Sequence, residues 1–290
     1  MKNNVENCEI NEMFISSILI SCAYKMDKNI NYKTFLNNSI VSKYLKNNID
    51  NKVIKYINDK FDFSYKVIYL RNEADAECMI CYNKDNCYLV FIGTQLSLDD
   101  KMSLYKDLLT DICLGLESID FLNCKIKIHS KYIDNMKCDN LLNRIEKIIN
   151  KLKFNEINIC GHSMGCGLGL YTSIALAHKF NDIYFNLITL DSPKIGNYSL
   201  NKYVKKVKNL KHIDLINNKD IVPLFPFIYP EYLHISSKTY ITDKEGNIKI
   251  CDKINELNIF TNYSVKDHFT NNIITNIYKC VKTKKIMHVN

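Results

Sequence analysis

The sequence predicts an α/β fold, with a mostly parallel central sheet flanked by helices and a helical segment at the N-terminus. From about residue 129, short apolar runs typical of buried strands alternate with stripes at helical spacing. Five of the eight glycines lie between Gly161 and Gly196, where these strands and helices follow one another. The 290-residue chain is 47% hydrophobic and lacks an apolar run long enough to cross a bilayer, which indicates a globular protein without a transmembrane segment.

The first half of the chain predicts helices followed by strands. Residues 10–60 predict two or three helices, with apolar residues at helical spacing between Phe35 and Leu45. Strand-like segments follow at 66–70, 77–82 and 87–94. The last two predict a hairpin around Lys84, Asp85 and Asn86.

The second half predicts the parallel part of the sheet. Helical stripes or helix-forming segments occupy 141–152, 164–179 and 200–208, and buried strands occupy 157–160, 183–190 and 211–216. No linker interrupts this alternation, so we expect one domain.

The charge argues against a nucleic-acid partner. The 39 basic residues exceed the 31 acidic ones, but only Arg71 and Arg144 are arginines. Proteins that read base sequence depend on the bidentate arginine fork, so the lysine excess is typical of a solvated surface. Abundant Asn, Lys and Ile indicate an AT-rich genome, such as that of a large DNA virus or a protist.

The N-terminal segment predicts a buried helix rather than an export signal. Residues 13–24 are apolar, but Glu6, Glu9 and Glu12 precede them where a signal peptide carries positive charge. We therefore expect an intracellular protein without a signal peptide.

The twelve cysteines do not predict a metal site. Cys78 and Cys81 form a C-x-x-C with Cys87 nearby, but no second ligand pair follows at zinc-site spacing. The segment predicts a hairpin with reduced, buried thiols, and we expect no metal.

The chemistry centres on Gly161-His162-Ser163-Met164-Gly165. A serine between a strand and a helix, with glycines two positions before and after it, is typical of a nucleophile elbow. Such a turn lifts the hydroxyl above the sheet at a helix N-terminus, where backbone N–H groups stabilise an oxyanion. A glycine-rich packing turn is the alternative.

A serine nucleophile needs a base and an orienting carboxylate. His268 lies in a polar loop before the last predicted helix, whereas His234 alternates with apolar neighbours in the manner of a core histidine. Asp220 follows strand 211–216, and Asp191, at the end of the preceding strand, is its rival. Strand-end position favours Asp220.

Seven segments, taken in order, resemble the class 3 lipases, the fungal-type triacylglycerol lipases of the α/β-hydrolase superfamily. They are VFIGTQ (90–95), DLLTDI (107–112), IHSKY (128–132), INICGHSMGCGLGL (157–170), TLDSPKIGN (189–197), NNKDIVPLFP (217–226) and YLHIS (232–236).

The resemblance covers roughly residues 60–275. We expect a single α/β-hydrolase, lipase-like domain over residues 1–290, with residues 1–60 as a helical segment packed on it. It implies Ser163, Asp220 and His268 as the catalytic triad, which selects Asp220 over Asp191. It also implies an oxyanion hole formed by Thr94 and the backbone N–H of Met164.

The sequence departs from the family at three places. Ile92 stands before Gly93-Thr94 where the family has arginine, Cys166 separates two glycines that are usually adjacent, and Asp191 replaces a glycine before Ser-Pro. None of these changes removes a predicted catalytic group.

The first hypothesis is therefore a serine carboxylester hydrolase that cleaves lipid esters without a cofactor. A phospholipase A1 or lysophospholipase is the alternative within the enzymes, and an inactive lipid-binding protein on a lipase scaffold is the third. The expected partner is a lipid or acylglycerol substrate. Transient contact with a membrane or lipid droplet has one candidate patch, the basic C-terminal stretch of Lys279, Lys282, Lys284 and Lys285, and a solvated tail is the alternative. The sequence predicts no oligomeric state.

Two segments are predicted to contact the substrate. Residues 95–106 predict a short amphipathic helix with Leu98 and Met102 on one face, which in the resembled family is the lid; a permanently docked helix is the alternative. The proline-stiffened run containing Phe225 and Phe227 predicts one wall of the acyl cleft, or else ordinary core.

Overall fold

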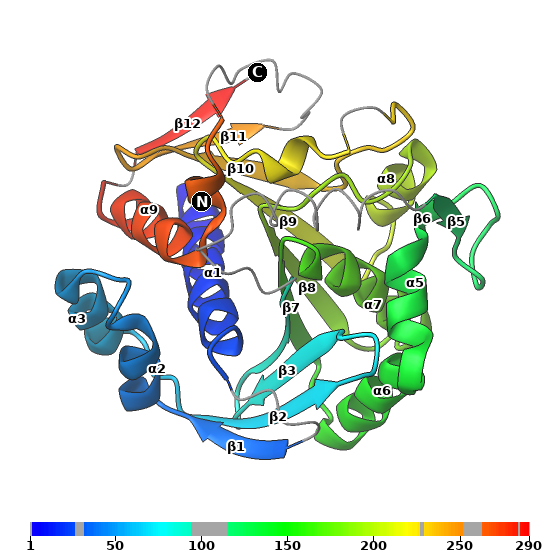
Figure 1. The fold of residues 1–290 in the computed structure, drawn as a ribbon, viewed down its shortest axis with the longest axis horizontal. Coiled ribbons are helices and arrows are strands. Elements are labelled where there is room, and N and C mark those ends of the chain that lie inside the picture. The colour runs from blue at the N-terminus through cyan, green and yellow to red at the C-terminus, as the bar shows by residue number, and fades with distance from the viewer. Residues whose placement is uncertain are drawn as a thin grey trace.

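A ten-stranded sheet runs through the molecule, with helices on both faces (Figure 1). The computed structural model describes residues 2–26, 32–93, 115–226, 229–251, 263–283 and 285–289. Along the sheet the strands are β1 (Tyr32–Leu36), β2 (Tyr65–Arg71), β3 (Glu77–Tyr82), β4 (Cys87–Phe91), β7 (Glu156–His162), β8 (Tyr184–Leu190), β9 (Leu210–Asn217), β10 (Lys238–Thr242), β11 (Asn247–Cys251) and β12 (Lys285–Val289).

The centre of the sheet is parallel and its flanks are mostly antiparallel. Strands β4, β7, β8, β9 and β10 pair in parallel, so their carboxyl ends meet at one edge. Strands β1 to β4 pair antiparallel, as do β10 and β11, and β12 adds a parallel edge strand to β11. The predicted α/β architecture is confirmed.

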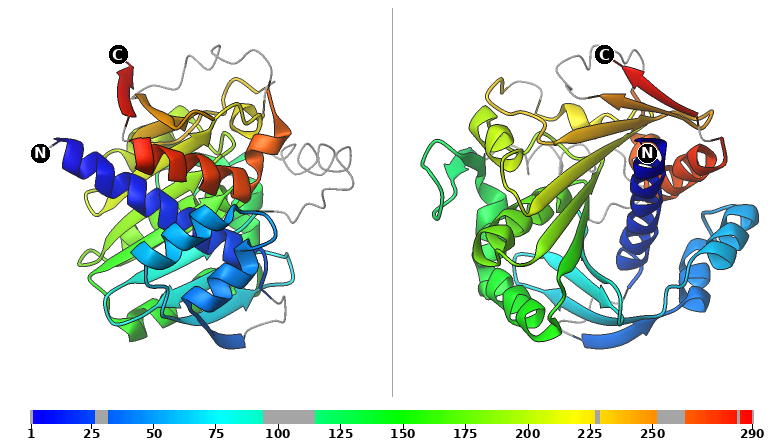
Figure 2. Two further views of the ribbon diagram at one scale, coloured as in Figure 1. Left: turned by 90° about the vertical axis from the view of Figure 1, so that its left-hand side faces the viewer. Right: turned by 180° about the vertical axis from the view of Figure 1, so that it is seen from behind.

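The two faces of the sheet are covered by helices from different parts of the chain (Figures 1 and 2). One face carries α1 (Lys2–Ala23), α2 (Asn38–Leu45), α3 (Asn51–Lys60) and α9 (Thr270–Thr283); the other carries α5 (Ser130–Lys137), α6 (Leu141–Leu152) and α7 (Gly165–Lys179). Helix α8 (Tyr198–Val204) and the small sheet of β5 (Leu116–Ser118) and β6 (Lys127–His129) lie beside the second face.

Strand β4 shows how the sequence builds both cores. Tyr88 and Val90 face the core under α1, whereas Leu89 and Phe91 face the core under α7. Because successive side chains point to opposite faces, a strand buried on both sides is continuously apolar. Polar side chains cap the N-termini of two helices: Asn37 caps α2 and Asn197 caps α8.

The predicted hairpin of β3 and β4 is confirmed, and its geometry argues against a shared zinc site. Cys78 and Cys81 lie three positions apart on β3, so they belong to the cores on opposite faces of the sheet. Their thiols are buried, and burial raises the pKa of both well above the usual range.

Some elements differ from the prediction. The N-terminal segment contains β1 at the sheet edge in addition to its three helices. At the other end of the described residues, β12 pairs with β11, and the sequence did not predict this edge strand. Within the part of the chain that the structure describes, no helix combines the length and apolar character needed to cross a membrane.

Candidate active site

Ser163 lies in a sharp turn between β7 and α7, at the carboxyl edge of the parallel strands. Its φ is 56°, in the left-handed region that a serine rarely adopts, and it is 3% exposed. Its N–H donates to the carbonyl of Leu190 at the end of β8. A strained serine at this point is the geometry expected of a nucleophile elbow.

The flanking glycines are needed because backbones approach closely there. A Cβ on Gly161 would lie 2.5 Å from the carbonyl oxygen of Gly165, and one on Gly165 would lie 2.5 Å from that of Phe91. Any side chain at either position would therefore separate β7 from α7, or α7 from β4. The sequence spacing around Ser163 follows from this packing.

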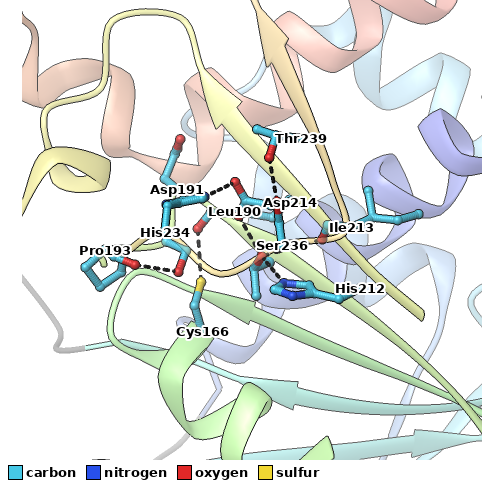
Figure 3. Close-up of polar contacts among 12 residues, drawn as sticks. Cys166, Leu190, Asp191, Pro193, His212, Ile213, Asp214, His234, Ser236 and Thr239 are labelled. Carbon is cyan, nitrogen blue, oxygen red and sulfur yellow. Dashed lines mark hydrogen bonds and ion pairs between the residues drawn. The ribbon is translucent and has the colours of Figure 1, made fainter. Parts of the chain in front are cut away.

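The structure accommodates the unusual Gly165-Cys166-Gly167 sequence. Cys166 is fully buried and its thiol donates to the Leu190 carbonyl at 3.4 Å (Figure 3). Gly167 lies under Tyr132 of α5, where a Cβ would be 2.1 Å from the ring. The thiol therefore fits beneath the end of β8 rather than in the elbow.

Asp220 and His268 lie in contact, as predicted for the acid and the base. Nδ1 of His268 lies 2.6 Å from Oδ2 of Asp220, and both side chains are buried. Oδ1 of Asp220 accepts the N–H of Val222 at 3.0 Å. Because a carboxylate accepts and does not donate, Nδ1 of His268 carries the proton and Nε2 is the basic nitrogen.

The loops that carry the acid and the base are joined to each other. Asp220 forms a parallel bridge with Ser264, whose N–H donates to the carbonyl of Lys219. The side chain of Asn217, at the end of β9, donates to the carbonyl of Asp267 at 2.6 Å. These contacts fix η4 (Val265–His268) against the sheet edge.

Nε2 of His268 is buried, and no described residue forms a hydrogen bond with it. The ring of His268 packs against that of His162, next to Ser163, with centroids 4.5 Å apart. The structure thus brings all three predicted triad residues to one edge of the sheet, and Nε2 is available for a hydroxyl proton. A loose nucleophile–base contact is common before substrate binds.

A directional chain of hydrogen bonds joins His162 to its surroundings. Its Nε2 lies 2.8 Å from the carbonyl oxygen of His268, so Nε2 is protonated and Nδ1 accepts from the hydroxyl of Tyr24 at 2.8 Å. That hydroxyl accepts the N–H of Gly93 at 2.9 Å. Burial, and then the proximity of His268, lower the pKa of His162 well below its usual value, so its ring is neutral.

The predicted oxyanion position is described in part. A Cβ on Gly93 would lie 2.9 Å from Cβ of Ser163 and 3.1 Å from the backbone nitrogen of Met164, so these three backbones converge. Thr94 lies outside the described residues.

Sequence reasoning missed Tyr24 and His162. His162 carried a signal, since it stands inside the elbow motif next to Ser163. Tyr24 carried none, because its partners lie 69 and 138 residues away along the chain.

Asp191, the rival acid, lies behind the triad rather than in it. It is fully buried at the end of β8 with a φ of 53°, which explains why this position suits a glycine. Its Oδ1 accepts the N–H of Asn217 at 2.6 Å. An Asp191 oxygen and one nitrogen each of His162 and His268 lie within 4.8 Å of one another. Both His162 nitrogens and Nδ1 of His268 already form hydrogen bonds, so this cluster does not suit a metal ion.

A second Asp–His pair lies deeper, among the strands (Figure 3). His234 Nε2 is 2.6 Å from Oδ2 of Asp214, and the hydroxyl of Thr189 donates to Oδ1 at 2.6 Å. The His234 side chain is 5% exposed and that of Asp214 is fully buried. His234 is a core histidine, as its apolar neighbours predicted.

The predicted substrate-contacting residues are largely beyond what the structure describes. Leu98, Met102 and Phe227 lie outside the described residues, and so does the predicted lid. Phe225 is 3% exposed and packs with Val222 and Ile221 in a small cluster beside the Asp220 loop.

Comparisons with known proteins agree with this geometry. The family model "Lipase (class 3)" matches residues 89–229. Toxin TseL of Vibrio cholerae is 29% identical over 89 residues, which are 31% of this chain and 13% of that protein. The secreted mono- and diacylglycerol lipase MDL3 of Malassezia globosa is 27% identical over 103 residues, 36% of this chain and 34% of that lipase. The chain thus spans about a third or less of the length of these relatives.

Solved structures share the fold over nearly the whole chain. The triacylglyceride lipase of Rhizomucor miehei superposes with a TM-score of 0.67 and 18% identity, covering 93% of this chain and 97% of that one. The LIP2 lipase of Yarrowia lipolytica gives a TM-score of 0.64 and 18% identity, covering 91% and 90%. The strained serine, its flanking glycines and the Asp–His pair follow the order of the family's motifs. Residues 89–229 match the class 3 lipase family, and the chain shares the α/β-hydrolase fold of these solved lipases.

Proposed function

We propose that this protein is a serine carboxylester hydrolase that cleaves lipid esters in the manner of a triacylglycerol lipase. The observation that carries the proposal is His268, held by Asp220 at Nδ1 with a buried, unoccupied Nε2, beside the strained Ser163. The Malassezia relative is a mono- and diacylglycerol lipase, which supports acylglycerols as the substrate class.

In the proposed reaction Ser163 Oγ attacks the ester carbonyl while Nε2 of His268 takes its proton. Asp220 holds the ring in the required tautomer and stabilises the imidazolium. The N–H groups of Met164 and Thr94 stabilise the oxyanion. The imidazolium then protonates the leaving alcohol. Water, deprotonated by His268, attacks the acyl-enzyme and releases the fatty acid and free Ser163.

Replacement of the nucleophile tests the proposal. We expect Ser163→Ala to lower kcat/KM on a soluble p-nitrophenyl ester by about 10³-fold or more, with unfolding by urea nearly unchanged. The matched control is Ser173→Ala, because Ser173 is a buried serine of α7 that donates only to the carbonyl of Leu170. Near-normal activity of Ser163→Ala would refute the assignment.

A fluorophosphonate probe separates an enzyme from an inactive lipase scaffold. We expect covalent labelling of the native protein and none of Ser163→Ala, since only an activated serine attacks phosphorus. An unlabelled native protein would favour a binding function.

The head group is determined with a lipid panel. We propose that acylglycerols are cleaved faster than phosphatidylcholine or lysophosphatidylcholine, with Leu98, Met102, Phe225 and Phe227 lining the acyl cleft. A preference for the phospholipids would establish the alternative function, phospholipase A1 or lysophospholipase, on the same triad.

We also propose transient contact with a lipid surface near the end of α9. There Lys279 donates to the carbonyl of Lys244, and Lys282 lies 4.2 Å above the ring of Tyr56, at the molecular surface. Co-sedimentation with anionic but not neutral vesicles, weakened by salt, is the expected result.

A further inference from the structure

The carboxyl group of Asp191 has surroundings that do not suit a negative charge. It is fully buried, and its Oδ1 accepts one backbone N–H, from Asn217. Its Oδ2 is buried, and no donor among the described residues reaches it. An ionised carboxylate with one of its two oxygens unpaired in the protein interior is costly.

The group that faces Asp191 is another carboxyl group. The side chains of Asp191 and Asp220 lie within hydrogen-bonding reach of each other. Two ionised carboxylates only accept, so a hydrogen bond between them requires a proton on one. Two acids this close share one proton rather than ionise together.

The other contacts indicate which acid holds the proton. Asp220 accepts from Nδ1 of His268 at 2.6 Å and from the N–H of Val222 at 3.0 Å, and both bonds favour the ionised form. Asp191 has one such donor. The proton therefore belongs on Oδ2 of Asp191, where it gives the orphaned oxygen a partner.

Every ionisable group around Asp191 is consistent with this assignment. The neighbouring acids Asp220 and Asp214 both raise the pKa of Asp191, and Cys166 on α7 is a buried thiol. His162 is neutral, and His268 is directed at Asp220. Burial, and then the charge of Asp220, raise the pKa of Asp191 well above its usual value.

We propose that Asp191 is a positioning residue of the triad: it remains a neutral carboxylic acid and donates its O–H to Asp220. Asp220 then has three donors instead of two. The added hydrogen bond draws charge from the carboxylate, so Asp220 stabilises a protonated His268 less strongly and the ring stays in its basic form to lower pH. The inference rests on the proposed function only for its effect on rate.

Two substitutions distinguish a donor from a charge. Asp191→Asn keeps the shape, tolerates a positive φ and retains a neutral N–H donor, but cannot ionise. Asp191→Gly removes the donor and suits the same backbone. The proposal predicts that the His268 ring titrates in Asp191→Asn as it does in the native protein, and that it titrates differently in Asp191→Gly.

The direct measurement is titration of the His268 ring by NMR with isotopically labelled histidine, in the Ser163→Ala background. We expect the midpoint to rise by about 0.5–1 pH unit in Asp191→Gly and to stay within about 0.2 unit in Asp191→Asn. A fall in both variants would show that Asp191 is ionised, and unchanged midpoints in both would show a purely structural role. Either result overturns the proposal.

The NMR titration needs no catalytic turnover. An absence of esterase activity would therefore refute the proposed function and leave the inference about Asp191 unaffected. If ester hydrolysis is present, the acid limb of kcat/KM should move in parallel with the titration.

A second measurement covers the case in which Asp191→Gly fails to fold. An acid whose pKa is higher in the folded state contributes stability at low pH that is lost as pH rises above about 4. The urea midpoint of the native protein should therefore fall relative to that of Asp191→Asn as pH rises from 4 to 8. A difference between the two urea midpoints that stayed constant from pH 4 to 8 would overturn the proposal.

Discussion

At the residue scale, Tyr24 connects three segments that meet at Ser163. Its hydroxyl accepts from Gly93 and donates to His162, which donates to the carbonyl of His268. One phenol thus links the backbone after β4, the turn at Ser163 and the loop of His268. Removal of the hydroxyl leaves a donor and an acceptor unpaired at the site.

We expect Tyr24→Phe to lower kcat/KM by about 10-fold or more and to destabilise the fold by about 1–3 kcal/mol. The matched control is Tyr69→Phe, which removes a buried hydroxyl that donates to Glu77 and not to a residue of the Tyr24 chain. The control should lose stability and retain its rate constants in the ester assay. Equal effects of the two variants on kcat/KM would contradict a positioning role for Tyr24.

The sequence brings out the three residues of the proposed triad because each follows a local pattern. Ser163 has its glycines, and Asp220 and His268 have their strand-end and loop positions. Neither the proposed hydrogen bond between Asp191 and Asp220 nor the chain through Tyr24 has a local pattern, since each depends on how distant segments pack.

At the element scale, Gly167 and Gly169, two of the three glycines of α7, have opposite packing. A Cβ on Gly167 would penetrate the ring of Tyr132, whereas a Cβ on Gly169 would meet its first neighbour, Leu187, at 3.4 Å, an ordinary contact. The two positions lie two residues apart, about half a turn, in the same buried helix.

We expect Gly167→Ala to destabilise the protein by about 1–3 kcal/mol, because α5 must move away from α7. Gly169→Ala should be neutral or stabilising by up to about 1 kcal/mol, because alanine favours a helix over glycine. Urea unfolding of both variants checks this pair. A loss of stability in Gly169→Ala equal to that in Gly167→Ala would show that the contact with Tyr132 does not decide the outcome.

The elements that the sequence predicts are those with a strong apolar pattern. The segments predicted at 77–82 and 141–152 coincide with β3 and α6. Strand β1 was not predicted because it is a short edge strand whose Phe35 is 65% exposed, so its pattern is not that of a core strand. Strands β5 and β6 have three residues each, too few to show a period.

At the scale of the whole molecule, buried histidines make the fold sensitive to acid. His212 on β9 is fully buried and donates from Nε2 to the hydroxyl of Thr189, 2.9 Å away. Burial lowers the pKa of His212 to about 4. Because the unfolded chain binds this proton near pH 6.5, stability is complete above that pH and falls as pH decreases toward 4.

We expect His212→Gln, which keeps an N–H for Thr189 but does not titrate, to remove this dependence. Between pH 7 and pH 4.5, the free energy of unfolding of the variant should gain about 2–3 kcal/mol relative to the native protein. Urea unfolding at several pH values measures the difference. If the free energies of unfolding of the variant and the native protein changed in parallel with pH, His212 would not be the cause of the acid sensitivity.

The long separations within the site determine when catalysis becomes possible during synthesis. The contact between Asp220 and His268 spans 48 residues, and that between His162 and His268 spans 106. A chain growing at about 5–20 residues per second contains Ser163 for about 5–20 s before His268 has been added. During that interval the elbow can fold on its strands but has no base. The growing chain therefore carries Ser163 without its proposed base, and the proposed ester hydrolysis can begin only when the segment leading into α9 has been made and docked.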